Sequence, residues 1–458
     1  LAQWNSAGED FSLYQPGFDD QGNLLVVSDQ PQDSESDGFW KLVRCADCET
    51  KPLDQNRYRE FETDLYLPKP GEEMGVAQWQ LGTRTWAIGG AKLLGSGLID
   101  GQAWLGWLES GKSVQAIESS DSLAARFHSL CWNEKTGSFY ALMESADRPC
   151  QVIEAGANSI IPLATLSVGL PKTLVNPESI QIRTATGNLY GHFYPAVNSV
   201  NEQAAFGDDC AQNVEPDTEK MGGVKAAPLV IQLHGGPTAY ADASLDMQKQ
   251  YWSANGFHLL VLNYRGSSGF GRTYRHALKN NWGITDVEDV FSACQYLVQQ
   301  RWAEPGAIFI RGNSAGGYTV LAALSDSNAR EFGIAGGASL YGISDLELLN
   351  QHTHKFESEY LSWLIGDPEV HRQRYRERSA IHRLNDFELP VIFFQGANDR
   401  VVPPDQTQRI HDALKEKGVA TEYCLFAGEG HGFRKAVNRQ TVLERELAFY
   451  LCQLKIGS

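Results

Sequence analysis

The chain has 458 residues and a formal net charge of −17 at pH 7, with 42% apolar and 21% charged residues. This composition is typical of a packed globular protein and excludes wholesale disorder. Nucleic acids and anionic membrane surfaces both attract clustered Lys and Arg, so the acidic balance argues against either as a partner. At roughly 150 residues per domain, the length predicts about two or three domains.

The sequence contains no run of about 18 apolar residues, so we expect no transmembrane helix. No secretory signal is visible, which indicates a cytoplasmic location. The 8 cysteines are too sparse for a disulfide scaffold, and we expect most of them to be reduced and buried.

Up to about residue 174 the sequence alternates short strand patterns with polar turns. Segments 18–28, 79–88 and 131–142 each combine a turn with an apolar strand. Strand-rich units that recur every roughly 40–50 residues are typical of propeller blades. A β-sandwich is an alternative that the pattern alone leaves open.

From about residue 177 the pattern changes to apolar strands that alternate with helices. A hairpin is expected over 178–194, followed by a polar, acidic surface loop over 198–226. Such alternation predicts a mostly parallel sheet covered on both faces, with its chemistry at the carboxyl ends of the strands. The expected strands are 229–233, 258–262, 307–310, 337–341, 391–395 and 423–426, and the expected helices are 286–300, 315–324, 406–417 and 439–451.

A strand leads directly into Gly312-Asn313-Ser314-Ala315-Gly316, and a helix follows. This is the G-x-S-x-G pattern in the context of strand, sharp turn and helix, which lifts the serine above the sheet edge. Side chains at either glycine would collide with the neighbouring strand and helix. We therefore predict Ser314 as a nucleophile, with a chance match in a Gly-rich turn as the alternative.

A serine nucleophile needs a general base and a carboxylate that orients the base, and in this type of fold they follow in the order Ser, Asp, His. Asp399 and His431 each lie directly beyond a predicted strand, in the required order. We therefore predict the catalytic triad Ser314, Asp399 and His431. Asp405 and Glu429 are the nearby alternatives; Asp405 is expected to cap the following helix, and Glu429 to be solvated or to brace the His431 loop.

Acyl transfer also needs backbone N–H donors for the negative charge that develops on the substrate carbonyl oxygen. One donor is expected at Ala315, next to the nucleophile. The second is expected in His234-Gly235-Gly236-Pro237, where small residues let the backbone approach the substrate. Within this loop we predict the N–H of Gly235, with a plain tight turn as the alternative.

Taken together and in order, these motifs resemble the catalytic domain of the prolyl oligopeptidase family of serine peptidases, over residues 177–458. The most similar branch is the acylaminoacyl-peptidase or dipeptidyl-aminopeptidase-like one. The resemblance implies an α/β-hydrolase domain capped by a β-propeller, cleavage of short peptides, and the triad described above. The segments that carry it are 234–237, 263–271, 282–283, 286–289, 312–317, 353–357, 401–404 and 429–433.

The resemblance also concerns the oxyanion site and the substrate pocket. In several branches a tyrosine side chain completes the oxyanion site at the position of His234; a neutral histidine can donate there, but backbone donors are the safer assumption. The resemblance implies an apolar pocket for a hydrophobic side chain before the scissile bond, with ordinary core packing as the alternative. The residues implied near the substrate are His234, Leu340, Tyr341, Ile343, Leu346 and Val402.

The predicted fold is therefore α/β, with residues 177–458 as an α/β-hydrolase peptidase domain and residues 1–176 as part of a β-propeller. The first segment is long enough for about three to four blades, fewer than the family's propeller needs. An open set of blades would expose unpaired strand edges. We therefore expect the chain, which begins with Leu1 rather than Met, to be the carboxyl-terminal portion of a longer protein.

Two residue pairs are expected to have no catalytic role. Cys45 and Cys48 have the spacing of zinc ligands, but no second pair accompanies them. Glu72 and Glu73 invite comparison with the glutamate pair that holds the free amino terminus in dipeptidyl peptidases of this family. Their sequence context does not match that motif and favours a solvated acidic turn. We therefore expect no metal and no cofactor.

The sequence thus predicts a serine exopeptidase that hydrolyses short peptides, with acylaminoacyl- or dipeptidyl-peptidase activity. A carboxylesterase is one alternative, since the same triad cleaves esters. A non-catalytic propeller scaffold is another, although the intact triad and oxyanion loop argue against it. Association into a homo-oligomer is compatible with the resemblance.

Overall fold

The computed structural model describes residues 2–6, 9–19, 21, 23–29, 41–45, 61–62, 65–66, 69, 71–75, 83–117, 123–171, 173–197, 224–352 and 358–457. The chain divides into two compact units. Unit 1 comprises Leu1–Leu174, Thr238–Leu245 and Ser267–His276, and unit 2 comprises Val175–Pro237, Asp246–Gly266 and Ala277–Ser458. Two short segments that the sequence analysis assigns to the second domain thus belong to unit 1.

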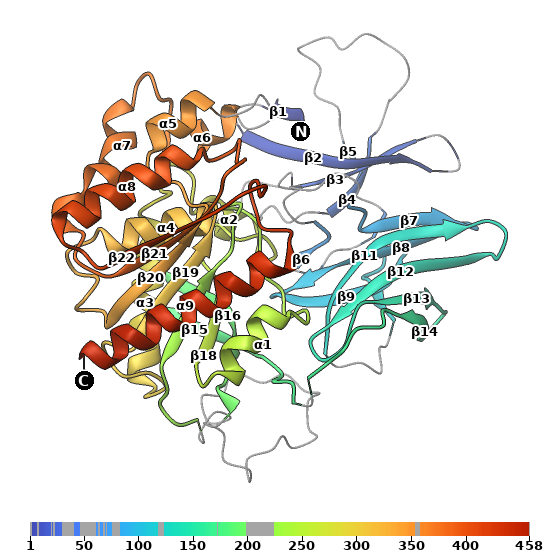
Figure 1. Ribbon diagram of the computed structural model, residues 1–458. Coiled ribbons are helices and arrows are strands. Elements are labelled where there is room, and N and C mark those ends of the chain that lie inside the picture. The colour runs from blue at the N-terminus through green and yellow to red at the C-terminus, as the bar shows by residue number, and fades with distance from the viewer. Residues whose placement is uncertain are drawn as a thin grey trace. The chain divides into compact units, whose positions relative to one another are not determined.

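The described strands of unit 1 form antiparallel sheets made of strands that are close in the chain (Figure 1). The first sheet has the order β1-β2-β3-β4-β5, the second β10-β9-β8-β6, and the third β11-β12-β13-β14. Strands β6 and β7 both pair with β8, but at different positions. Strand β6 pairs with Leu98 and Ile99, and β7 pairs with residues 92–95 of the same strand. The strands are β1 Ala2–Ser6, β2 Glu9–Phe18, β3 Leu24–Ser28, β4 Lys41–Cys45, β5 Phe61–Glu62, β6 Glu72–Glu73, β7 Trp86–Gly89, β8 Lys92–Ile99, β9 Gln102–Leu108, β10 Gln115–Ala116, β11 Ala124–Asn133, β12 Ser138–Ser145, β13 Gln151–Ala155 and β14 Ile160–Thr165.

Apolar side chains between neighbouring sheets hold unit 1 together. In β12, buried positions alternate with more exposed ones, as expected for a strand with one face in the core. Trp86 of the second sheet packs in one cluster with Leu25 of the first sheet. Leu94 of the second sheet packs in another cluster with Phe127 of the third. The strand-rich prediction agrees with these sheets, whereas closure into a propeller stays a prediction.

Unit 2 contains a sheet in the order β15-β16-β18-β17-β19-β20-β21-β22. The pairs β15/β16 and β16/β18 are antiparallel, and the later neighbours pair in parallel. Strands β18 and β21 are buried along their whole length, as expected for a sheet covered on both faces. The strands are β15 Glu178–Thr184, β16 Gly187–Tyr194, β17 Leu229–Leu233, β18 His258–Asn263, β19 Ile308–Asn313, β20 Ile334–Leu340, β21 Val391–Gly396 and β22 Thr421–Phe426.

Helices cover both faces of this sheet (Figure 1). Strand β19 shows the alternation: Ile308 and Ile310 belong to the core cluster that includes α3 and α4, whereas the ring of Phe309 stacks on Tyr450 of α9 at 4.2 Å between centroids. The helices are α1 Met247–Ala254, α2 Arg272–His276 (a part of unit 1), α3 Thr285–Gln299, α4 Ala315–Leu324, α5 Leu346–His352, α6 Ser358–Ile365, α7 Arg372–Glu377, α8 Pro404–Lys417 and α9 Ala436–Gly457, with 3₁₀ turns at Ala380–His382 and Leu384–Asp386.

The expected strands and long helices of unit 2 coincide with observed elements to within three residues at each end, except that α9 continues to Gly457, six residues beyond its expected end. The short helices α1, α5, α6 and α7 are absent from the prediction, because 6 to 8 residues are too few to establish a helical period. The motif at 353–357 and most of the expected loop at 198–226 lie outside the described residues.

Candidate active site

The segment between β19 and α4 forms a sharp turn with Ser314 at its apex. Ser314 has φ +53° and ψ −118°, a conformation that residues other than glycine rarely adopt. Its backbone N–H donates to the carbonyl oxygen of Leu340 at 2.9 Å, which ties the turn to the end of β20. The hydroxyl makes no capping bond to α4, so it is available to another partner.

Glycines around Ser314 allow the loop after β17 to approach the nucleophile turn. A Cβ atom on Gly316 would lie 2.4 Å from the carbonyl oxygen of Leu233. A Cβ atom on Gly235 would lie 2.7 Å from Nδ2 of Asn313. Real Cβ atoms do not tolerate such distances, so the close approach at these positions requires glycine.

Two hydrogen bonds connect Ser314, His431 and Asp399. Nε2 of His431 lies 2.8 Å from Oγ of Ser314, and Nδ1 of His431 lies 2.8 Å from Oδ2 of Asp399. Because a carboxylate accepts, Nδ1 carries the imidazole proton and Nε2 is free to accept the hydroxyl proton. The structure therefore brings together three side chains that the sequence places after β19, β21 and β22.

The carboxylate of Asp399 is buried and held by donors that the sequence analysis does not identify. Its Oδ1 atom accepts hydrogen bonds of 2.9 Å from the backbone N–H groups of Val401 and Val402. Its Oδ2 atom also accepts a hydrogen bond of 3.2 Å from Nε2 of Gln395. These bonds orient the carboxylate toward His431. Asp399 lies in a tight turn directly after β21. An Asp in such a turn accepts hydrogen bonds from backbone N–H groups that follow it in the chain, and this local pattern accounts for the two backbone donors.

The loop that carries His431 is held on two sides. The ring of Tyr341, which follows β20, packs edge-on against His431 with centroids 4.9 Å apart. The buried carboxylate of Glu429 accepts hydrogen bonds from two backbone N–H groups and one side-chain amide that follow His431 in the chain. Glu429 thus braces the loop, and Asp399 is the carboxylate that contacts the imidazole.

The predicted oxyanion donors both border Ser314. Ala315 is the first residue of α4, and the first N–H groups of a helix have no acceptor within the helix. A Cβ atom on Gly235 would lie 3.4 Å from Cβ of Ser314, so the backbone of this glycine is close to the nucleophile. The N-terminus of a helix also favours negative charge.

His234 is a neutral side chain in this site. Burial lowers the pKa of His234 to about 4. Its ring stacks on Tyr264 with centroids 4.4 Å apart, and its Nδ1 atom lies 3.1 Å from the carbonyl oxygen of Gly235. The ring of His234 is thus engaged by its own loop and by Tyr264, whose hydroxyl oxygen lies 3.4 Å from the same Nδ1 atom. This engagement favours the backbone donors for the oxyanion.

The apolar residues predicted near the substrate lie mostly in the core. Leu340 is buried, and Ile343, Leu346 and Val402 belong to the core cluster of unit 2. Leu346 and Val402 have no exposed surface, so core packing accounts for their apolar character. Val402 contributes to the site through its backbone bond to Asp399.

Two expectations about acidic residues are wrong. Asp405 lies in the first turn of α8 but makes no capping bond, because this helix has no side-chain cap. Glu72 and Glu73 form β6 and have no exposed surface, so they are not a solvated acidic turn. Glu72 accepts a hydrogen bond of 2.9 Å from the backbone N–H of Lys69, three residues before it. The partners of Glu73 lie far away in the sequence, where no local pattern indicates them.

Buried polar contacts anchor the elements that carry Ser314. Arg311, within β19, forms an ion pair with Glu446 of α9 at 2.8 Å. Thr319, in α4, donates a hydrogen bond of 2.5 Å to the buried carboxylate of Asp286 in α3. Each contact joins two elements that are distant in the chain, so the sequence analysis missed both.

Within the described part of the chain, no group of three or more His, Cys, Asp or Glu residues is arranged to hold a metal ion. No helix in this part is both long and apolar enough to cross a bilayer. Cys48 and the side chain of Cys45 lie outside it. The cysteines described as free thiols are Cys131, Cys150, Cys294, Cys424 and Cys452, of which the first and last are exposed, contrary to expectation.

A family model and several known proteins are similar to the second part of the chain. The model of the prolyl oligopeptidase family matches residues 243–457. Dipeptidyl aminopeptidase BIII of Pseudoxanthomonas mexicana is 30% identical over 218 residues, which cover 46% of this chain and 31% of that protein. The acylamino-acid-releasing enzyme of Arabidopsis thaliana is 28% identical over 219 residues, which cover 45% of this chain and 28% of that protein.

A solved structure is similar along almost the whole chain. A puromycin-hydrolyzing peptidase of Mycobacterium tuberculosis shares 30% identity with a TM-score of 0.78, over 97% of this chain and 62% of that one. The chain thus spans less than two thirds of each of these relatives. The comparisons confirm the predicted family resemblance and the fold class, a β-rich part followed by an α/β-hydrolase domain.

Proposed function

We propose that this chain, with its prolyl oligopeptidase family domain at residues 243–457, is a serine peptidase that hydrolyses short peptides. The observation that carries the proposal is the hydrogen-bonded series Ser314, His431, Asp399, with both bonds at 2.8 Å. Acyl transfer to a serine requires this arrangement of nucleophile, base and orienting carboxylate. The names of the relatives, an aminopeptidase and an acylamino-acid-releasing enzyme, support peptides as substrates.

In the proposed first step, Oγ of Ser314 attacks the carbonyl carbon of the scissile amide while Nε2 of His431 takes the hydroxyl proton. The imidazolium then gives this proton to the amide nitrogen as the C–N bond breaks. The amine product leaves, and the acyl group stays on Ser314 as an ester. Asp399 holds the Nδ1–H bond throughout and stabilises the positive imidazolium.

In the second step a water molecule attacks the ester carbonyl, and Nε2 of His431 takes a proton from it. The same proton returns to Oγ of Ser314 as the C–O bond breaks and the acid product leaves. In both steps the carbonyl oxygen becomes negative, and the N–H groups of Gly235 and Ala315 are the proposed donors to it.

Labelling with a fluorophosphonate tests whether Ser314 is an activated nucleophile. We expect the wild-type chain to be labelled at Ser314 and the variant Ser314→Ala to remain unlabelled. An unlabelled wild-type chain would favour the non-catalytic scaffold instead.

Turnover of three substrate types ranks the remaining activities. An acetyl-amino-acid anilide, a dipeptidyl anilide and a short-chain ester report acylaminoacyl-peptidase, dipeptidyl-peptidase and carboxylesterase activity respectively. We expect hydrolysis of an anilide, and ester hydrolysis without any anilide hydrolysis would contradict the peptidase proposal. A cytoplasmic location and association into a homo-oligomer stay predictions from the sequence.

A further inference from the structure

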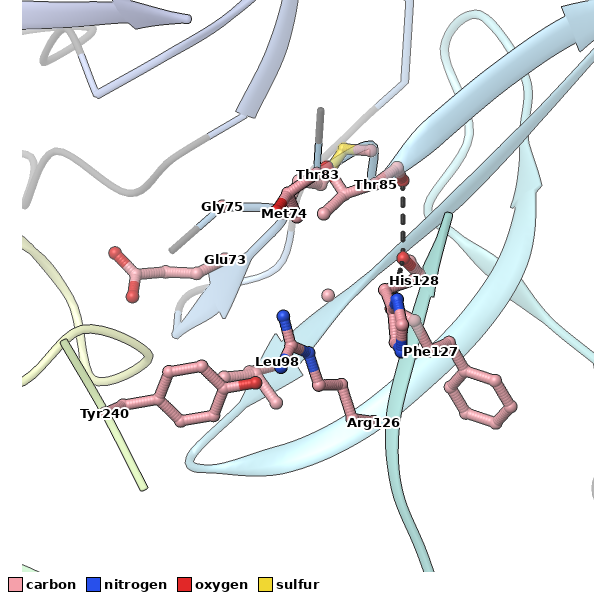
Figure 2. A pocket seen from close by; sticks show the side chains of 12 residues that line it. Glu73, Met74, Gly75, Thr83, Thr85, Leu98, Arg126, Phe127, His128 and Tyr240 are labelled. Atoms are coloured by element: carbon pink, nitrogen blue, oxygen red, sulfur yellow. Dashed lines mark hydrogen bonds between the residues drawn. The ribbon is translucent and has the colours of Figure 1, made fainter. Parts of the chain in front are cut away.

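Buried carboxylates of this protein are held by two kinds of side chain. Glu73, which lines a hollow in unit 1 (Figure 2), accepts a hydrogen bond of 3.2 Å from the guanidinium of Arg275. Glu446 of unit 2 likewise forms an ion pair with Arg311 at 2.8 Å. The carboxylate of Asp399 is also buried, but none of the described arginines or lysines forms an ion pair with it. A neutral side chain holds Asp399 instead.

Gln395, the penultimate residue of β21, supplies this neutral donor. Its side chain has no exposed surface, and residues 391–394 before it in the strand are apolar. Its Nε2 atom lies 3.2 Å from Oδ2 of Asp399 and 3.1 Å from the carbonyl oxygen of Val402. Both partners are acceptors, so the amide nitrogen, with its two N–H groups, faces them. The side chain thus directs one N–H donor at the carboxylate of Asp399.

Helix α8 fixes the other end of the same amide. The hydroxyl of Thr407, which is also buried, donates a hydrogen bond of 2.8 Å to Oε1 of Gln395. A buried amide is costly unless its donors and its acceptor are bonded, and here both ends have partners. An apolar side chain would fill this strand position without that requirement. Packing alone therefore does not account for a glutamine here.

The amide and His431 donate to the same atom of Asp399. Nδ1 of His431 lies 2.8 Å from Oδ2, the oxygen that Nε2 of Gln395 also contacts. A hydrogen bond to a carboxylate stabilises its negative charge, so the carboxylate gains less from a neighbouring imidazolium. A cation in place of the amide would neutralise the carboxylate and remove most of this attraction. The neutral amide fixes Oδ2 and leaves the negative charge to act on His431.

We propose that Gln395 is a positioning residue of the catalytic centre, which holds Oδ2 of Asp399 against His431 and limits how tightly the imidazole keeps its proton. The inference rests on the proposed peptidase function and adds a residue that touches neither the substrate nor the reacting atoms. A fixed Oδ2 keeps the imidazole aimed at Ser314. A weaker hold on the proton favours its transfer from Nε2 of His431 to the leaving amide nitrogen.

The test depends on pH, so the other groups that face the imidazole matter. Among the described residues, the titratable side chains in contact with His431 are Asp399 and Tyr341. Burial raises the pKa of Tyr341 more than Arg311 and Arg439 lower it, so the phenol stays neutral. The charge on the imidazole therefore depends chiefly on Asp399 and on what is bonded to that carboxylate.

The loop that carries His431 contributes further charges. A hydrogen bond from the backbone N–H of Arg434 lowers the pKa of Glu429, so this carboxylate stays charged. The ammonium group of Lys435 donates to the carbonyl oxygen of Ala427 at 3.2 Å. Neither charged group is hydrogen-bonded to Gln395. Substitution of Gln395 therefore leaves these charges in place.

The pH dependence of turnover tests the role of Gln395. Gln395→Met replaces the amide by an apolar side chain of similar length, and kcat/KM for an anilide substrate is measured across the acidic range. We expect the pH of half-maximal kcat/KM to rise by at least about 0.5 unit, because the carboxylate then attracts the imidazolium more strongly. We expect kcat on the plateau to fall at least about threefold and KM to change less than about twofold. A smaller pH shift, or one toward lower pH, would overturn the proposal.

Gln408→Met is the matched control for this substitution. Gln408 of α8 also donates from Nε2 to a carboxylate, that of Asp412, but this contact is exposed. We expect its pH profile and kcat to equal those of the wild type, and an equal shift in both variants would contradict the proposal.

A double variant keeps the test valid should Gln395→Met fail to fold. In Gln395→Met/Thr407→Val the hydroxyl that would lose its acceptor is also removed. Replacement of both partners of a buried hydrogen bond by apolar groups of similar shape is nearly neutral for stability. The donor to Asp399 is still absent, so we expect the same rise in the pH of half-maximal kcat/KM.

An NMR titration distinguishes this proposal from the peptidase function. Histidine rings of the whole chain are labelled with ¹⁵N, and the signal of His431 is identified by its absence in His431→Gln. We expect its titration midpoint to lie at least about 0.5 pH unit higher in Gln395→Met than in the wild type. Absence of both fluorophosphonate labelling and turnover would refute the peptidase function and leave this titration measurable. Turnover with an unmoved titration would support the peptidase function and refute the role of Gln395.

Discussion

The hydroxyl of Thr319 donates a 2.5 Å hydrogen bond to Oδ2 of Asp286, and this contact joins helix α4 to helix α3. The other oxygen of Asp286 accepts a hydrogen bond of 2.6 Å from the backbone N–H of Gly283. The carboxylate has no exposed surface. Because α4 begins directly after Ser314, a buried acid thus helps to place the helix of the proposed nucleophile.

The burial of Asp286 predicts a specific dependence of stability on pH. Burial raises the pKa of Asp286 from 3.8 to about 6, so the folded state binds this proton more tightly than the unfolded state. Its contribution to the free energy of unfolding is therefore greatest below pH 3.8 and is lost as the pH rises through 6, by about 3 kcal/mol in total. Urea unfolding of the wild type and of Asp286→Asn at several pH values measures this change. The difference in stability between the two proteins should shift by that amount, and a constant difference would contradict the prediction.

Replacement of Asp399 by Asn is predicted to abolish most activity without unfolding the protein. The amide oxygen can keep the hydrogen bonds from Val401 and Val402, which leaves its NH₂ group facing Nδ1 of His431. The imidazole proton is then forced onto Nε2, which can no longer accept from Ser314. We expect kcat to fall by roughly 10⁴-fold, with the melting temperature nearly unchanged.

Asp405→Asn is the matched control for this change, because Asp405 is an exposed carboxylate six residues further along the chain. We expect its kcat to equal that of the wild type. A fall of similar size in both variants would show that the loss does not come from the contact with His431.

The buried ion pair of Arg311 and Glu446 is predicted to contribute more to the free energy of unfolding than the exposed pair of Arg445 and Glu422. Glu446 has no exposed surface and also accepts a hydrogen bond of 2.9 Å from Tyr450. The change Glu446→Leu leaves the guanidinium buried and unpaired, and we expect a loss of about 3–5 kcal/mol in the free energy of unfolding. The double variant Arg311→Met/Glu446→Leu should recover most of this loss, since no charge is then left unpaired.

The exposed pair of Arg445 and Glu422 supplies the comparison, because Arg445 is next to Glu446 in the chain and the two side chains are 55% and 39% exposed. For Glu422→Gln we expect a change below about 1 kcal/mol. Chemical denaturation of all these variants under one condition measures both effects. If both single variants lost the same stability, burial would not be the cause.

The glycine at position 316 is predicted to be required for activity. A Cβ atom there would lie 2.4 Å and 2.7 Å from the carbonyl oxygens of Leu233 and His234, so Gly316→Ala must displace the loop that carries Gly235. Displacement of an oxyanion donor is expected to lower kcat/KM at least about tenfold. In Gly418→Ala the new Cβ meets no atom within 4 Å, although φ is +85°. We expect that control to lose about 1 kcal/mol of stability and to keep its kcat, as steady-state kinetics on one ester substrate can establish.

The sequence by itself was sufficient to propose the catalytic centre and the fold of the second domain. Ser314, Asp399 and His431 each follow a continuous apolar strand, and parallel strands bring their carboxyl ends to one edge of a sheet. Glycine needs no long-range information to be predicted at a sharp turn, because the restriction on φ is local. These signals lie within a few residues of the groups that they identify.

Only the tertiary structure determined which of the other charged side chains are buried and which groups they contact. The local sequence predicts that Glu73 is solvated. In the structure its partners are Gly269 and Arg275, which lie 196 and 202 positions away in the chain. Burial and hydrogen bonding depend on which distant segments meet, and a buried polar group is stable only when such a partner is present. For this reason the proposed catalytic centre followed from local rules, whereas the burial of Glu73 did not.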